Sequence, residues 1–233
     1  DLFTSYDIPD ETNLSYFSPS FYIEKNTTNN RIYPTEGSTY RMSLRFTHLK
    51  EDYQPGSTSL DALPISKKVH NSISFRNYFE SYTPITKKFT LGWIADITIS
   101  NRTAMGDRIS SLLYLPAFQP TPHSKTLLLS SNRSQSFVGL AVMPIFRFTK
   151  SLSVHVMGAY FQPYKLLEKT NDGSTLFSPI FPSGNFSAEI AGVWQSPVGP
   201  VTLSASYYDK SDVKWFPQLN IGFLIFKPKA LAY

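Results

Sequence analysis

Five charged residues occupy the polar positions of stretches that otherwise alternate between apolar and polar side chains. They are Arg41, Arg45, Arg76, Asp96 and Glu189. Successive side chains of an extended strand leave opposite faces, so these five should share one face with small and polar neighbours. Opposite charges on one face can pair into a network that lines an enclosed, aqueous interior. They can equally be independently solvated, and the residue types leave both alternatives open.

Motifs for catalysis, cofactors and metals are missing from the sequence. No Gly is followed two places later by Ser, which excludes the Gly-x-Ser-x-Gly elbow of serine hydrolases. Asp172–Gly173 could supply the carboxylate of a Ser–Asp dyad, but within "EKTNDGSTLFSP" it is typical of a loop turn. The histidines stand singly, without the spacing of metal ligands: His48, His70, His123 and His155. We expect no catalytic residue, metal site or cofactor in this chain.

The composition restricts the class of protein. Of the 233 residues, 17% are charged and 15% aromatic, whereas soluble proteins average roughly 25% charged residues. Polar residues interrupt every apolar run before the roughly 18 to 20 residues that a membrane helix needs. The net charge of +5 is scattered, with doublets only at Lys67–Lys68 and Lys87–Lys88, so we expect no nucleic-acid partner. The absence of cysteine excludes disulfides and thiol catalysis.

Period-two alternation recurs along nearly the whole chain and predicts the elements that position the charges. No segment shows a helical stripe with capping residues, so the sequence predicts an all-β fold. We expect about nine strands, mostly of about 9 to 13 residues, which is longer than in globular sheets. The alternating stretches are 17–23, 40–46, 69–79, 89–99, 138–148, 152–160, 186–194, 201–207 and 219–225. Tilted strands of roughly 9 to 11 residues suit a bilayer.

The connections between these strands alternate in length. The long ones are 50–68, 101–134 and 167–183, the short ones are 82–87, 149–151 and 197–200, and an intermediate one is 208–215. Outer-membrane barrels show this habit, because their short turns face the periplasm and their long loops face outside. We expect the proline-containing connection 101–134 to form an ordered plug or an external cap.

The stretch "STYRMSLRFTH" raises the question of which medium each face meets. A soluble barrel or sandwich would turn Leu44 and Phe46 inward, whereas a membrane barrel turns them to lipid. A charge facing lipid at mid-depth costs about 2 to 4 kcal/mol, so in a membrane Arg41 and Arg45 must line the interior. The pattern favours the membrane barrel. Aromatic residues near strand ends fit an interfacial girdle: Tyr78, Tyr82, Tyr160, Tyr164, Trp194, Tyr207 and Trp215.

Several stretches resemble the BamA-like surface-antigen barrels. "NTTNNRIYPTEGSTYRMSLRF" resembles the signature that precedes an upward strand, and "QSPVGPVTLSASYYD" resembles the penultimate hairpin with its tight periplasmic turn. The closing "NIGFLIF" is similar to the C-terminal signal that the barrel-assembly machinery reads, with Asn220, Gly222, Phe223 and Phe226 as its positions. More narrowly, "EDYQPGSTS", "LPAFQPTPHSKTLLL" and "FQPYKLL" are similar to the C-terminal outer-membrane barrel of patatin-like phospholipases.

The resemblance implies an antiparallel transmembrane β-barrel in the outer membrane of a Gram-negative bacterium, commonly with sixteen strands. It assigns 13–227 to a barrel segment, 1–12 to a lead-in or the end of a preceding strand, and 228–233 to a tail. Nine strands cannot close an antiparallel barrel of even count, so upstream strands or another chain must complete it. Membrane lipids and the barrel-assembly machinery are the other implied partners.

The beginning, "DLFTSYDIPDETN", lacks a basic region followed by an apolar region, so we expect a removed signal or a piece of a longer protein.

Three functions are compatible with the predicted barrel. The first is the anchor or translocator portion of a patatin-like phospholipase, whose lipid hydrolase domain is not in this chain. The second is a stand-alone BamA-like barrel for protein insertion, secretion or lipid handling. The third is a barrel with its own active site, so enzymatic activity stays open.

The C-terminal signal predicts two sensitive positions. Phe226→Ala and Gly222→Asp should each lower the amount of protein in the outer membrane, because a terminal aromatic and a close-packed glycine are parts of that signal. Quantifying the protein in isolated outer membranes measures the effect. Normal levels of both variants would contradict this interpretation of the C-terminus.

Overall fold

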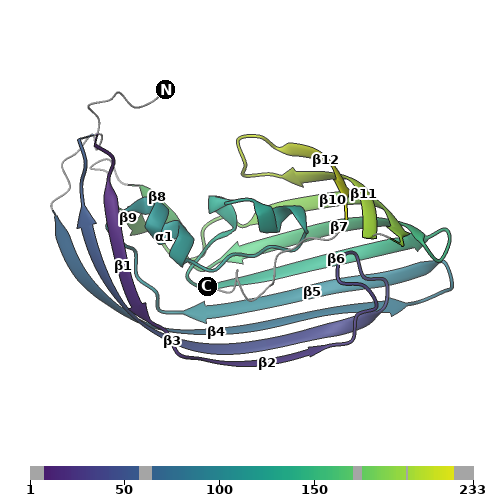
Figure 1. Cartoon of the computed structure of the whole chain (residues 1–233), viewed down its shortest axis with the longest axis horizontal. Helices are drawn as coiled ribbons and strands as arrows, with labels where there is room; N and C mark the ends of the chain where they lie inside the picture. Colours follow the sequence, from purple (N-terminus) through teal and green to yellow (C-terminus); the bar gives the residue numbers. More distant parts are fainter. Residues whose placement is uncertain (1–7, 58–64, 170–174, 198, 223–233) are drawn as a thin grey trace.

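The computed structural model of the chain describes residues 8–57, 65–169, 175–197 and 199–222. Antiparallel β-sheet dominates these residues, which confirms the all-β prediction (Figure 1). The main sheet contains β1 (Glu11–Phe17), β2 (Ser20–Asn26), β3 (Gly37–Gln54), β4 (Ser66–Pro84), β5 (Phe89–Ser100), β6 (Phe137–Arg147), β7 (Leu152–Pro163), β10 (Asn185–Ser196), β11 (Gly199–Tyr208) and β12 (Trp215–Ile221). The smaller elements are α1 (Arg108–Tyr114), the 3-10 helices η1 (His123–Thr126) and η2 (Ser130–Asn132), and the hairpin β8 (Leu167–Lys169) and β9 (Thr175–Phe177).

The strands β1 and β2 together form one interrupted edge strand, because both pair with β3 in a single continuous register. Pro19 causes the interruption, since proline has no amide proton to donate to β3. Its carbonyl still accepts the amide of Phe46 at 3.1 Å. The Ser18 hydroxyl donates to the Phe46 carbonyl at 3.2 Å, in place of the missing amide. The two faces of the sheet are therefore continuous through the break.

Nine strand positions cross the main sheet when β1 and β2 are counted as one, in the order β1/β2-β3-β4-β5-β6-β7-β10-β11-β12. The described parts of all nine predicted stretches lie in these positions. Two strands are longer than predicted, β3 with 18 residues and β4 with 19. The connection between them is correspondingly shorter than expected from the sequence. The predicted long loops and short turns lie at opposite ends of the strands, but the connection 27–36 between β2 and β3 is an exception, since it lies at the short-turn end.

The sheet curves into a trough, with the short helices on its concave side (Figure 1). Its two edges are the β1/β2 strand and β12, and no strand pairing between described residues joins them. The described part of the chain is therefore an open curved sheet. These residues do not form by themselves the closed barrel that the resemblance implies.

The two faces of the trough are opposite in character. On the convex face of β5, Leu91 and Trp93 keep 38% and 42% of their surface accessible. On the concave face of the same strand, Thr90 and Thr98 keep 0% and 2% of their surface accessible. Among the described residues, buried polar side chains outnumber buried apolar ones, which reverses the usual distribution of soluble proteins. The alternating pattern therefore separates a mainly apolar outer face from an inner face that carries the buried polar side chains together with an apolar cluster on β4 to β7.

Two aromatic residues do not belong to the predicted girdle. Tyr82 points to the concave face, where it is buried in an apolar cluster with Ile94 and Met143, and Tyr78 packs against this cluster. Both share the parity of Arg76 along β4, so strand alternation turns them inward. The girdle interpretation is wrong for these two tyrosines. The exposed members of the predicted set are Tyr160, Tyr164, Trp194 and Trp215.

The helix α1 forms where the period-two pattern predicts no helix. The Asp107 side chain caps its first turn and accepts the Ser110 amide at 2.7 Å. At the other end, Arg133 Nη1 donates to the carbonyls of Leu112 and Leu115, each at 2.9 Å. With seven residues, α1 depends on such side-chain contacts more than on helix propensity.

The β5–β6 loop, residues 101–136, packs onto the concave face and carries α1, η1 and η2 (Figure 1). Phe118 is 1% exposed, with ring centroids of Phe137 and Phe161 at 6.3 and 6.1 Å. Gly139 makes room for it, because a methyl group there would come within 2.3 Å of the Phe118 ring. The prediction that this connection is ordered is confirmed, and it lies on the inner side of the sheet.

This contact predicts that Gly139→Ala lowers the free energy of unfolding by about 1 to 3 kcal/mol, the usual effect of overpacking. It should also expose the β5–β6 loop to protease, because the Phe118 ring must move. Urea titration and limited proteolysis measure the two effects. Gly158→Ala is the matched control, since a methyl group there meets nothing closer than 3.8 Å. Equal destabilisation by both variants would contradict the role of Gly139.

Candidate functional site on the concave face

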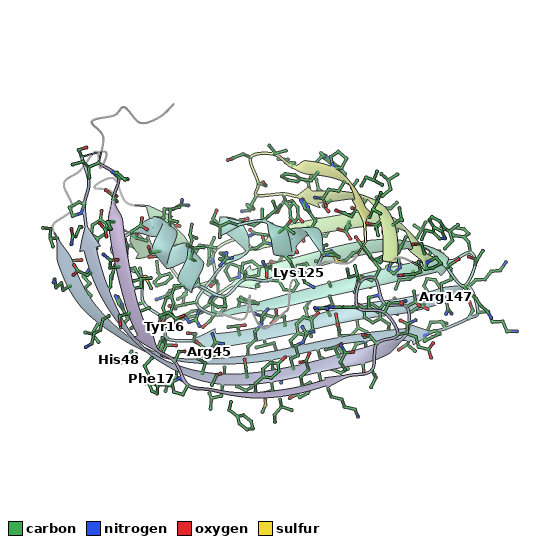
Figure 2. All side chains as sticks on the ribbon, in the orientation of Figure 1. Tyr16, Phe17, Arg45, His48, Lys125 and Arg147 are labelled. Atoms are coloured by element: carbon green, nitrogen blue, oxygen red, sulfur yellow. The ribbon has the colours of Figure 1, made fainter. Side chains whose placement is uncertain are left out.

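The five charges predicted to share one face all lie on the concave face. Strand pairing puts Arg41, Tyr78 and Asp96 in one cross-strand row, and it puts Arg45 opposite Ser74 in another. The remaining two predicted charges are Arg76 on β4 and Glu189 on β10. Figure 2 shows Lys125, from η1, over the same inner side, whereas Phe17 and His48 lie on the outer side.

Arg76 and Asp96 form the tightest ion pair of the described residues. Arg76 Nε donates to Asp96 Oδ1 at 3.0 Å and Nη2 donates to Oδ2 at 2.6 Å, which is a bidentate arrangement. Nη2 also donates to the carbonyl of Ala117 at 3.2 Å, which ties the pair to the β5–β6 loop. Because the Asp96 side chain is 1% exposed, its charge depends on this partner.

The other predicted charges have separate partners. Arg41 Nε donates to Glu24 Oε1 at 3.0 Å, and its guanidinium lies over the Tyr78 ring at 5.2 Å. The Arg45 side chain makes no hydrogen bond or ion pair with another described residue. The structure therefore brings the predicted charges onto one face in local clusters, without direct contacts that join all of them.

Glu189 is held by a residue from the opposite side of the trough. The Tyr33 hydroxyl, in the turn between β2 and β3, donates to Glu189 Oε1 at 3.1 Å, and Ser206 donates to Oε2 at 3.0 Å. The Tyr33 ring also contacts His155 edge-on, with centroids 5.2 Å apart. A cavity of about 240 Å³ lies beside Tyr33 and His123 and reaches the last residues of β12.

Arg102, the second residue after β5, is a buried cation that the sequence pattern did not single out. Its Nε donates to Ser74 at 3.1 Å, and Nη1 donates to the Tyr114 carbonyl. Its guanidinium also lies 4.5 Å from the Tyr114 ring centroid. Burial lowers the pKa of Arg102 to about 10, and the nearby charges of Arg45 and Arg76 act in the same direction. Among the described residues, no carboxylate compensates this charge.

A second cluster that sequence reasoning missed joins Glu51, His70 and Thr103. His70 Nε2 lies 2.7 Å from Glu51 Oε2, and Nδ1 lies 2.7 Å from the Thr103 hydroxyl. Chemically this is a hydroxyl–imidazole–carboxylate chain. Glu51 Oε1 also accepts the amide of Gly106 at 2.7 Å, so the cluster holds both Thr103 and Gly106 against β3 and β4. We interpret it as the anchor of the β5–β6 loop.

The predicted C-terminal signal is only partly described. Asn220 is an exposed residue of β12, and Gly222 follows it with a φ of +97°, a conformation that favours glycine. Phe223 and Phe226 lie outside the described residues, as do Asp172 and Gly173.

In the described ranges no group of His, Asp and Glu side chains could hold a metal ion. No helix among these residues is long and apolar enough to cross a membrane. No protein-family model matches the chain, and no curated protein matches it.

The Arg76–Asp96 geometry predicts that breaking this ion pair costs much more stability than breaking the Arg41–Glu24 pair. Arg76→Met should lower the free energy of unfolding by roughly 3 kcal/mol, because it leaves the buried Asp96 carboxylate without a partner. Arg41→Met should cost about 1 kcal/mol or less, because the Arg41–Glu24 pair is more exposed. Urea titrations of both variants test this. The double variant Arg76→Met/Asp96→Leu should recover much of the loss, and the prediction fails if it does not.

Proposed function

We propose that this chain is the outer-membrane β-barrel portion of a patatin-like phospholipase from a Gram-negative bacterium. In this role it anchors the enzyme and holds or displays a lipid hydrolase domain that the chain does not itself contain. The proposal is supported by the reversed faces of the sheet. Leu44 and Phe46, which a soluble barrel would bury, are 47% and 42% exposed on the convex face.

The apolar part of the convex face has a polar boundary. Along β3, the exposed Leu44 and Phe46 are followed on the same face by His48, Lys50 and Asp52. An apolar band of limited height with polar residues beyond it is what a strand that crosses a bilayer requires. The parts of β3 and β4 that extend past the end of β5 lie on this polar side, so we infer that they extend beyond the membrane.

The open edges of the sheet support the expectation of further strands. In hydrocarbon an unpaired backbone amide or carbonyl costs several kcal/mol, so only a closed sheet is stable there. The outer edges of β1/β2 and β12 have no strand partner among the described residues. We infer that upstream strands or another chain pair with these edges, in a barrel of sixteen strands.

The concave face favours an anchor or a gated translocator over an open channel. The β5–β6 loop covers part of this face through Phe118 and the Glu51–His70–Thr103 cluster. The alternative, a stand-alone BamA-like barrel for protein insertion, secretion or lipid handling, differs in what precedes the barrel. A Gly-x-Ser-x-Gly and Asp-Gly dyad upstream supports the phospholipase, whereas tandem αβ domains upstream support the alternative.

A matched pair of substitutions tests the membrane role. Ile73 and Val69 lie on the same face of β4 and are 55% and 57% exposed. Only Ile73 lies within the apolar band, so Ile73→Arg should cost about 2 to 4 kcal/mol in a bilayer, and Val69→Arg should cost much less. Unfolding in urea after reconstitution into lipid vesicles measures the difference.

Heat-modifiable migration in gels gives an independent measure of the same role. The parent protein in detergent should migrate differently before and after boiling, and it should precipitate when detergent is removed. If Ile73→Arg and Val69→Arg are equally well tolerated and the protein stays monomeric in plain buffer, the membrane proposal is wrong.

A further inference from the structure

The end of the sheet that carries the short turns has a cluster of positive charge. Lys87 and Lys88 lie in the turn between β4 and β5, Lys150 lies in the turn between β6 and β7, and Arg147 ends β6. The three lysines are exposed and Arg147 is half-buried. No Asp or Glu occurs in residues 81–90 or 145–153, which form these turns and their flanks. We call these four residues the basic rim.

The two turns of the basic rim are held together by backbone contacts. The Arg147 amide donates to the Lys88 carbonyl at 2.8 Å, and Arg147 Nη2 donates to the Thr86 carbonyl at 2.9 Å. Phe89 and Phe146 pair across β5 and β6, with ring centroids 5.4 Å apart. The charges therefore stand on a fixed scaffold. Figure 2 shows Arg147 at the end of the sheet far from Phe17 and His48.

Exposed apolar side chains stand between these charges. Ile85 is 58% exposed, Phe148 is 63% exposed and Phe146 is 46% exposed. Phe146 continues directly into the apolar convex face, in the row that begins with Phe89. Lysine and arginine can lie with their stems along such apolar surface while their charged ends reach outward.

We propose that the basic rim binds the phosphate groups of anionic phospholipids in the leaflet that the short turns face. This inference rests on the proposed membrane role and adds a partner of defined chemistry to it. Lys87, Lys88 and Lys150 contact the phosphates electrostatically, while Ile85 and Phe148 enter the interfacial region of the bilayer. Free phosphate or a nucleic acid would explain the charge but not the apolar residues beside it.

The opposite end of the sheet carries charges of both signs. There Lys67 pairs with Asp52 at 3.0 Å, and Glu11 and Asp10 lie on neighbouring segments. Carboxylates thus offset part of the positive charge at that end, whereas they are missing from the turns of the basic rim. The asymmetry predicts a preference for anionic lipid at one end of the strands only.

The test compares two triple variants of the parent protein reconstituted into phosphatidylcholine vesicles that contain a small share of spin-labelled phosphatidylglycerol. The first variant is Lys87→Gln/Lys88→Gln/Lys150→Gln. The matched control is Lys50→Gln/Lys67→Gln/Lys68→Gln, which removes the same charge from the opposite end. Electron paramagnetic resonance gives the association of labelled phosphatidylglycerol relative to labelled phosphatidylcholine.

We expect the unmodified protein and the control to bind phosphatidylglycerol several-fold better than phosphatidylcholine, and the basic-rim variant to lose most of this preference. Raising the salt concentration should weaken the preference, and inorganic phosphate should not compete at equal ionic strength. No preference in the unmodified protein, or an equal loss in both variants, overturns the inference. Heat-modifiable migration of the same samples reports insertion separately. If the samples insert but show no such lipid preference, the inference is wrong and the proposed membrane role is unaffected. Failure to insert would overturn both proposals.

Discussion

Continuous antiparallel register is the constraint on which the rest of the structure depends. Because side chains alternate with a period of two, a shift of one residue at any strand would exchange its apolar and polar sets between the faces. The described residues show no such shift. The row through Arg41, Tyr78, Asp96 and Gly139 crosses four strands on the same face. The sheet therefore keeps its exposed apolar side chains on the convex face, and its buried polar side chains lie on the concave face beside an apolar cluster on β4 to β7.

Buried polar groups on the inner face need hydrogen-bond and ion-pair partners, and the β5–β6 loop supplies some of them. The buried Asp96 requires Arg76, and Arg76 in turn binds the carbonyl of Ala117 in the β5–β6 loop. The same loop supplies Phe118, which fills the space left by Gly139. Ion pairing and packing thus act together at one place on the concave face. The order of this long loop follows from the chemistry of the wall that it covers.

The sequence predicts features that depend on local pattern and leaves out those that depend on distant contacts. Period-two alternation identifies all nine strand positions, the face of each and the alternation of loop lengths. It cannot show that Tyr33 reaches Glu189, because 156 residues separate them. Nor does it bring His70 to Glu51, since the hydrogen bond depends on the register of β3 against β4. The sequence does not predict the helix α1, because the segment is short and a single capping residue is its only helix signal.

The break at Pro19 affects only one side of the edge strand. In an antiparallel pair, successive residues direct their amides alternately toward one neighbour and the other. Pro19 faces Phe46, and Ser18 already supplies the donor that is missing there. The backbone groups of Ser18 and Ser20 consequently point the other way and stay available to an incoming strand. An edge with proline usually discourages further growth of a sheet, but this one can still serve as a template for the next strand.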